Sequence, residues 1–112
     1  MTVRDAQKRI AAEVSKWDGV EAGPHRFGGT EFRVGKRELG HVHGDQQVDV
    51  VFPMPVRNSL VEGRRAEPHH ILPESGWVTF RINKEKDVAE AIELFRDSYE
   101  EARKRSSTDT QK

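Results

Sequence analysis

The chain has 112 residues, of which 34% are charged, and its 19 basic and 19 acidic side chains cancel. Without a net field, the chain is not expected to bind nucleic acid or an anionic membrane surface. It has no cysteine, which excludes disulfides, thiolate metal sites and cysteine nucleophiles.

The length of the chain and the composition of its two ends indicate its domain organisation. The N-terminal segment MTVRDAQKRI is charged where a signal peptide needs an apolar run, and no stretch approaches the roughly 20 apolar residues of a membrane span. We therefore expect a cytoplasmic protein with a single domain over residues 1–105. A disordered polar tail is expected over residues 106–112. The sequence does not indicate an oligomeric state.

Apolar residues near both ends follow the spacing of amphipathic helices, each with one buried stripe. The first helix is predicted over residues 3–17 with Thr2 as its N-cap, and its stripe consists of Val3, Ile10, Val14 and Trp17. The last helix is predicted from a cap at Asn83 to about Lys104, and its stripe consists of Val88, Ile92, Phe95, Tyr99 and Ala102.

Three dipeptides between these helices can each form a two-residue hairpin turn, because glycine supplies the positive φ that such turns need. They are Gly28-Gly29, Gly35-Lys36 and Gly44-Asp45. Three hairpins in succession predict a four-stranded antiparallel meander. Its predicted cross-strand pairs are Phe27–Thr30, His25–Phe32, Phe32–Leu39, Val34–Arg37, Thr30–His41, His41–Val48 and Leu39–Val50.

This register sorts the side chains onto two faces, because paired residues share a face and neighbours along a strand alternate. The apolar face is predicted to hold His25, Phe27, Thr30, Phe32, Val34, Leu39, His41, His43, Val48, Val50 and Phe52. The polar face is predicted to hold Arg26, Glu31, Arg33, Glu38, Gln47 and Asp49, with Val42 and Val51 as apolar exceptions. Arg26 would pair with Glu31, and Arg33 with Glu38.

The segment after the meander predicts a short helix, a loop and a further strand. PMPVRNSLVEG has proline near the start of a helix and Gly63 just past its end. Pro68 and Pro73 argue for a loop, and WVTFRI over residues 77–82 alternates as a fifth strand. The fold class is therefore α+β: an antiparallel meander of four to five strands, with the N-terminal and C-terminal helices packed on one face. The place of the 77–82 strand in the sheet stays open.

The histidines are the candidate functional residues. His41 and His43 lie two apart on one strand and so share a face, where two imidazoles can bind a metal ion or one can act as a neutral base in a dry pocket. They are equally compatible with a structural role. His69 and His70 lie in the proline-bounded loop beside Glu67, and such loops often carry binding groups.

Three further residues leave open questions. Glu38 is three residues from His41, but the register places it on the opposite face unless a bulge at Gly40 turns the strand. His25 is expected to pack beside Phe27 and Phe32 rather than bind a metal. Trp77 is expected either to wall a pocket or to bridge to a helix.

The segments ELGHVHG, AEPHH and SGWVTFRI, followed by DVAEAIELF, resemble a bacterial family of luciferase-domain proteins, which is named for its similarity to fungal luciferase. The resemblance covers roughly residues 23–101 and implies functional roles for Glu38, His41, His43, Glu67 and His69. Fungal luciferases oxidise a hydroxylated pyrone with molecular oxygen, without flavin or nucleotide. The chain also resembles, more faintly, the double-wing proteins of the MmcQ/YjbR type, which have been proposed to bind DNA.

Two functional hypotheses follow. The first is a domain that binds a small aromatic or enol-type ligand at His41, His43 and His69, with Glu67 and Glu38 as further candidates and with acid–base or oxygen-dependent chemistry. Whether it is an enzyme stays open. No organic cofactor is expected, and a divalent metal on His41, His43, His69 or His70 is a narrower alternative. The second is a non-catalytic protein- or DNA-interaction module that uses Arg64 and Arg65.

Overall fold

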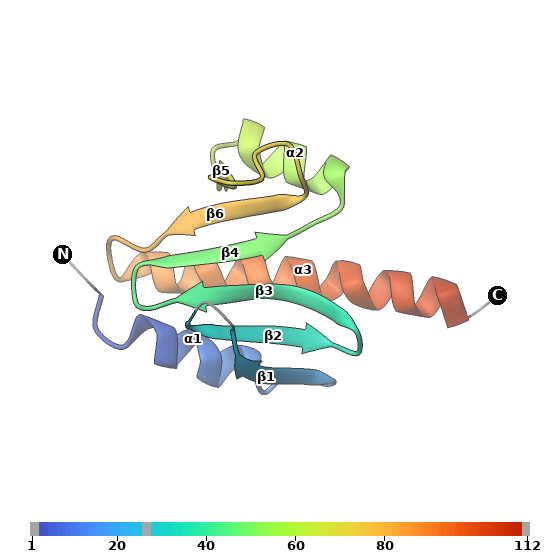
Figure 1. Ribbon diagram of the computed structural model, residues 1–112, viewed down its shortest axis with the longest axis horizontal. Helices are drawn as coiled ribbons and strands as arrows, with labels where there is room; N and C mark the ends of the chain where they lie inside the picture. The colour runs from blue at the N-terminus through green and yellow to red at the C-terminus, as the bar shows by residue number, and fades with distance from the viewer. Residues whose placement is uncertain (1–2, 26–27, 111–112) are drawn as a thin grey trace.

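The computed structural model describes residues 3–25 and 28–110. Its centre is a six-stranded antiparallel sheet in the order β1-β2-β3-β4-β6-β5 (Figure 1). The strands are β1 Val20–Pro24, β2 Thr30–Val34, β3 Arg37–His43, β4 Gln47–Val51, β5 Glu67–Pro68 and β6 Trp77–Arg81. The helices are α1 Ala6–Val14, α2 Met54–Glu62 and α3 Lys86–Thr110. The predicted α+β class is confirmed, and the strand predicted over residues 77–82 lies beside β4.

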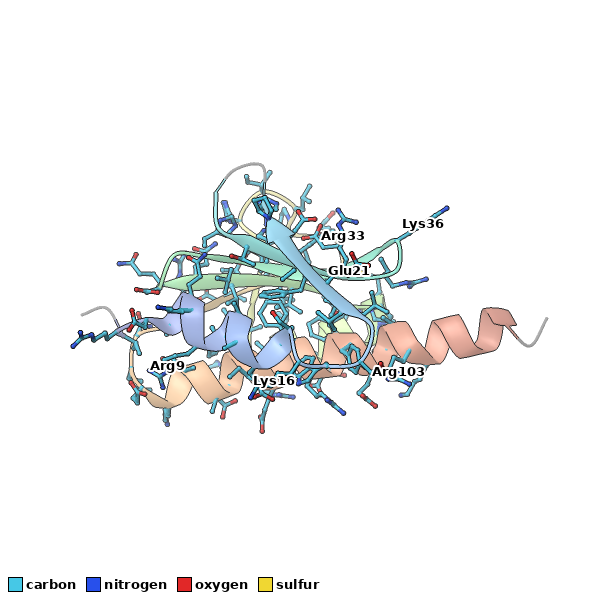
Figure 2. All side chains as sticks on the ribbon, turned by 90° about the horizontal axis from the view of Figure 1, so that it is seen from below. Arg9, Lys16, Glu21, Arg33, Lys36 and Arg103 are labelled. Atoms are coloured by element: carbon cyan, nitrogen blue, oxygen red, sulfur yellow. The ribbon has the colours of Figure 1, made fainter. Side chains whose placement is uncertain are left out.

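Helices α1 and α3 form one layer on one face of the sheet (Figure 2), which is called the helix face below. Arg33 lies on the opposite side of the sheet, which is called the open face. The predicted helical stripes are buried against the helix face: Val3, Ile10, Val14, Val88, Phe95, Tyr99 and Ala102 belong to the core. Trp17 and Ile92 pack at its margin.

The ends of the helices differ somewhat from the sequence prediction. Thr2 lies outside the described residues, and Asp5 is the N-cap of α1. Helix α3 begins at Lys86, where the carboxylate of Asp87 accepts hydrogen bonds from the backbone N–H groups of Asn83 and Lys84. It continues to Thr110, beyond the predicted end near Lys104. As predicted, α2 has proline in its first turn, and Gly63 follows its last residue as the C-cap. In the described parts of the chain, no helix combines the length and apolarity that crossing a membrane requires.

Only one of the three predicted hairpins has the predicted geometry. Val34 pairs with Arg37 around Gly35-Lys36, and the predicted Arg33–Glu38 pair is present with an ion-pair distance of 3.9 Å. The turn after His43 contains three residues, since His43 pairs with Gln47. A third residue in this turn shifts the β3–β4 register by one position from the prediction.

The first hairpin also differs, because its first strand, β1, lies earlier in the chain than predicted. Strand β1 ends at Pro24, which pairs with Thr30, and Ala22 rather than His25 pairs with Phe32. The predicted Phe27–Thr30 pair and the Arg26–Glu31 pair involve residues outside the described range. The connection is a longer loop, in which the backbone N–H of His25 donates to the carbonyl of Gly29 at 3.2 Å.

A β-bulge in β3 overturns the predicted distribution of the histidines. Arg33 pairs with Glu38, but Phe32 pairs with Gly40, so Leu39 is an extra residue on β3. Because one inserted residue flips every side chain beyond it, His41 moves from the predicted apolar face to the open face. There it joins Glu38, which the prediction placed on the opposite side from the histidine.

The bulge also changes the faces of the sheet on which the residues after it lie. Val42, predicted as an exception on the polar face, is fully buried in the core, and it pairs with Val48. His43 and Asp49 share the open face with His41, because His41 pairs directly with Asp49. Phe32, Leu39 and Val48, which were predicted to share a face with His41 and His43, therefore lie on the other side of the sheet.

Candidate functional site

The centre of the candidate site is Asp49, an acidic side chain that is only 1% exposed. It lies in the middle of β4, flanked by the core residues Val48 and Val50. Burying a carboxylate is costly unless it is paired and hydrogen-bonded, and Asp49 has several partners. Thr79 on β6 donates its hydroxyl to Oδ1 at 2.7 Å, and the amide Nε2 of Gln47 donates to Oδ1 at 3.4 Å.

The other carboxylate oxygen, Asp49 Oδ2, faces three imidazole rings. It lies 3.2 Å from His41 Nε2, 3.1 Å from His43 Nε2 and 3.7 Å from His69 Nε2. We call Asp49, His41, His43 and His69 the Asp49 cluster. Three of the predicted site histidines thus meet at one oxygen atom, around an acid that the prediction placed on the opposite face.

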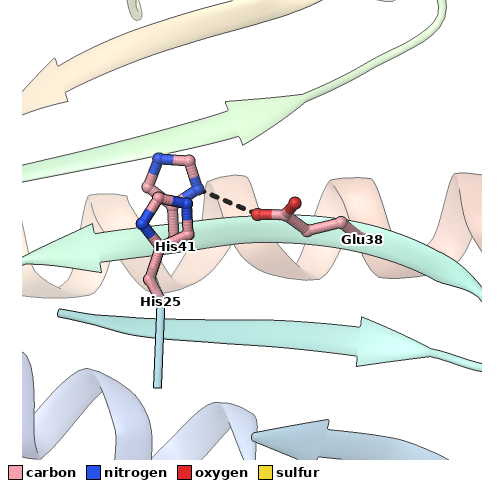
Figure 3. A group of neighbouring side chains, drawn as sticks. All are labelled: His25, Glu38 and His41. Carbon is pink, nitrogen blue, oxygen red and sulfur yellow. Dashed lines mark hydrogen bonds and ion pairs between the residues drawn. The ribbon is translucent and has the colours of Figure 1, made fainter. Parts of the chain in front are cut away.

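His41 lies between two carboxylates. Its Nδ1 is 2.8 Å from Glu38 Oε2 (Figure 3) and its Nε2 faces Asp49. Burial by itself would lower the pKa of His41, but hydrogen bonds to Asp49 and Glu38 outweigh it and raise the pKa to about 9. Burial likewise opposes ionisation of Asp49, but hydrogen bonds from His41 and Thr79 lower its pKa to about 2. His41 is therefore a cation at neutral pH, held by two anions.

The other two rings of the cluster are neutral. Burial, together with the positive charge of His41, lowers the pKa of His43 despite the attraction of Asp49. Burial also lowers the pKa of His69, against the attraction of Asp49 and with repulsion from His70 and His41. His69 Nδ1 accepts hydrogen bonds from the backbone N–H groups of Ile71 and Leu72, both at 3.2 Å. A neutral His69 ring must therefore carry its proton on Nε2.

Two more histidines lie at the margin of the cluster. The ring of His25 stacks on that of His41, with centroids 4.0 Å apart and planes at 24° (Figure 3). The exposed ring of His70 stacks on His69 with centroids 4.7 Å apart. His25 was expected to pack beside Phe27 and Phe32; it packs instead against the site.

Glu67 is not part of the Asp49 cluster. It lies on the short edge strand β5, its side chain is 67% exposed, and its carboxylate is 3.7 Å from Arg81 Nε. The backbone pairs Glu67 with Thr79 on β6, which donates to Asp49 on β4, so β6 lies between the two acids. Arg64 and Arg65 are exposed and lie apart from the cluster; Arg65 lies 3.7 Å from Asp97.

An open groove of about 810 Å³ covers the cluster. One part of its wall is polar and consists of His25, Glu38, His41, His43, Gln47, Asp49, His69, His70 and Arg81. The other part is apolar and consists of Ile71, Leu72 and Trp77. Of the two roles considered for Trp77, the pocket wall is the one observed, with its ring centroid 5.2 Å from that of His41. Ile71 and Leu72 are 70% and 48% exposed, which is unusual for aliphatic residues and extends the apolar wall to the surface.

Asp49 and Thr79 were not among the residues predicted for the site. A signal was present for Asp49: an acidic residue lies in the middle of a short run of valines, VDVV, where a buried strand would be apolar throughout. A buried acid of this kind needs partners. Thr79 could be identified only from the adjacency of β6 and β4, which the sequence did not specify.

Comparison with known proteins agrees with the resemblance noted from the sequence. No curated protein and no solved structure matches the chain significantly. The family model of the Luciferase domain matches residues 36–98. This range is more than half of the chain and runs from the start of β3 into α3, so it contains every member of the Asp49 cluster. The chain therefore belongs to the Luciferase domain family.

Proposed function

We propose that the domain binds a small, planar, acidic ligand of the aromatic or enol type in the groove and removes a proton from it. The observation that carries this proposal is the mixed lining of the groove, in which Trp77, Ile71 and Leu72 lie together with the histidine–carboxylate cluster. A planar ring would contact the apolar side. Its acidic oxygen would face the histidines, and the cationic ring of His41 would stabilise the anion that forms.

His43 is the base in this proposal, by elimination within the cluster. His41 already carries its proton between Glu38 and Asp49. His69 accepts two backbone hydrogen bonds at Nδ1 and holds its proton on Nε2, so neither ring nitrogen is a free acceptor. His43 is neutral and contacts Asp49 through Nε2, which leaves Nδ1 to take the ligand's proton. Asp49 would then stabilise the imidazolium that results.

The test uses metal-free protein and two probes, a hydroxypyrone and its methyl ether. It compares the binding of the two probes and measures deuterium exchange into the hydroxypyrone. The ether has the same ring without the acidic proton. We expect the hydroxypyrone to shift the NMR resonances of Trp77 and His43, and the ether to bind at least about tenfold more weakly. The anion shares its charge with a ring carbon, so the deuterated imidazolium of His43 can donate a deuteron to that carbon and then take up the proton the carbon carried, which restores the anion. We expect His43→Asn to abolish this protein-catalysed deuterium exchange into the pyrone ring and to leave binding within about threefold. Equal binding of both probes, or unchanged exchange in His43→Asn, would contradict the proposal.

Oxidation of the bound ligand by molecular oxygen is measured separately. The family resemblance suggests that the bound anion reacts with molecular oxygen, which consumption of oxygen in the presence of the hydroxypyrone would reveal. His70→Asn is the matched control, because His70 is an exposed histidine in the same groove that does not contact Asp49. We expect this variant to behave as the unmodified protein in both assays.

A further inference from the structure

The Asp49 cluster contains three atoms that stand where the ligands of one metal ion would stand. His41, His43 and Asp49 each offer one ligand atom, and these three atoms lie within 4.8 Å of one another. Asp49 Oδ2 is 3.2 Å from His41 Nε2 and 3.1 Å from His43 Nε2. Bonds of about 2.0 to 2.1 Å place neighbouring ligands of a first-row divalent ion roughly 3.0 to 3.4 Å apart. Hydrogen bonds have a similar length, so the surrounding contacts must distinguish the two arrangements.

A metal ion at this position would replace the protons that Nε2 of His41 and Nε2 of His43 hold toward Asp49 Oδ2, and the surrounding contacts suit this replacement. His41 Nδ1 is engaged by Glu38 Oε2 at 2.8 Å, which is the arrangement in which a carboxylate orients a metal-binding imidazole and leaves Nε2 for the ion. Asp49 Oδ1 is engaged by Thr79 and Gln47, so Oδ2 is the oxygen available to an ion. Both ligands are thus held by further hydrogen bonds.

The ligands also sit on a rigid part of the fold. His41 and His43 are two apart on β3, and Asp49 lies directly opposite His41 on β4. Both strands are interior strands of the sheet, so the three side chains are fixed by backbone pairing rather than by a loop. The side chains of Asp49 and His41 are 1% and 10% exposed, whereas that of His43 is 32% exposed and opens to the groove.

We propose that His41, His43 and Asp49 bind one divalent transition-metal ion through two imidazole nitrogens and one carboxylate oxygen. This set leaves coordination positions open toward the groove, as in non-haem iron sites and catalytic zinc sites. Imidazole donors favour zinc or ferrous iron over magnesium or calcium. His69 is excluded from the set, because its Nδ1 accepts backbone hydrogen bonds and its Nε2 carries the proton. It is instead a donor 3.7 Å from Asp49 Oδ2.

The inference goes beyond the proposed function and does not depend on it. Metal bound at Nε2 would place the ring proton of His43 on Nδ1, so the proton exchange described above belongs to the metal-free protein. Ligand binding and metal binding are measured separately, and either can fail while the other stands.

The test is a titration of metal-free protein with zinc, ferrous iron, cobalt and magnesium, without any organic ligand. We expect zinc and ferrous iron to bind at one equivalent, cobalt to give visible absorption bands from a nitrogen- and oxygen-bound ion, and magnesium not to compete. His43→Ala should weaken zinc binding more than about 100-fold, and Glu38→Gln about 10- to 100-fold. His43 is half-exposed, so its removal leaves the core intact.

Two further variants define the ligand set. His70→Ala removes an exposed histidine of the same groove and should leave the affinity within about threefold. His69→Ala should also keep stoichiometric binding. Absence of stoichiometric zinc binding would overturn the proposal, and so would equal losses in His70→Ala and His43→Ala, which would indicate adventitious binding. A loss in His69→Ala as large as in His43→Ala would overturn the proposed ligand set.

Discussion

The backbone of Gly40 lies against the backbone of Asp49, so closely that a Cβ atom at position 40 would come within 2.4 Å of the Asp49 carbonyl oxygen. The same atom would lie 2.9 Å from Phe95 Cε1 on α3. Gly40 pairs with Phe32 at the bulge that turns His41 to the open face. The glycine thus lets α3 and β4 close around a bulge on which the site depends.

Gly40→Ala is therefore expected to destabilise the fold by about 2 kcal/mol or more, because neither a backbone carbonyl nor a buried ring can move aside cheaply. Chemical denaturation measures the free energy of unfolding. Gly23→Ala on β1 is the control: apart from its chain neighbours, no atom of the residues that the structure describes lies within 4 Å of the added Cβ, and a change within about 0.5 kcal/mol is expected. Equal effects of the two substitutions would show that the close approach at Gly40 is not a constraint.

Ser98 on α3 makes a hydrogen bond to the bulge in β3. Its buried hydroxyl lies 3.1 Å from the carbonyl oxygen of Leu39, the extra residue of β3, and 2.8 Å from that of Val51. Ser98→Ala would leave at least one of these carbonyls without its donor and is expected to cost about 1 to 2 kcal/mol. Ser59→Ala, which removes an exposed hydroxyl bonded within α2, should cost less than about 0.5 kcal/mol. If both variants unfold at the same denaturant concentration, Ser98 has no special role at the bulge.

The stability of the metal-free protein is expected to fall in mildly alkaline solution. The pKa of His41 is raised to about 9 in the folded state, against an ordinary value of about 6.5 in the unfolded chain. Its contribution is fully present below about pH 6.5 and is lost as the pH rises through about 9, with an upper bound of about 3 kcal/mol. Denaturation at a series of pH values measures this. His41→Gln should remove the alkaline decline, and His70→Gln should retain it; a decline that persists in His41→Gln would assign it to another group.

Protonation of His41 should also be visible in the fluorescence of Trp77, whose ring centroid is 5.2 Å from that of His41. A protonated imidazole quenches a neighbouring indole, so emission should rise with pH around a midpoint near 9. Trp17→Phe leaves Trp77 as the sole tryptophan and removes the emission of the other, which lies beside Tyr99. Adding His41→Gln to Trp17→Phe should abolish the step. A midpoint near 6.5 would contradict the placement of His41 between two acids.

Local patterns in the amino-acid sequence were enough to predict several elements of the fold. Helical spacing identified α1 and α3 through residues such as Ile10 and Phe95, and proline and glycine placed α2. The Gly35-Lys36 turn fixed the register at the start of β3, including the Arg33–Glu38 pair. The segments ELGHVHG, AEPHH and SGWVTFRI also predicted the Luciferase domain family, which the match to the family model confirms. Each of these inferences depends on residues close together in the chain.

The side of the sheet that carries the site depends on contacts between segments that are distant in the chain. The bulge at Leu39 and the three-residue turn after His43 each change the alternation by one position, and neither is dictated by the local sequence, because glycine permits a bulge without requiring one. Burial decides the register of β3. It places Val42 in the core, and Phe95 packs so close to Gly40 that a Cβ atom at position 40 would collide with its ring. The charged Asp49 then meets His41 across β3 and β4, a contact that depends on strand pairing and not on sequence spacing.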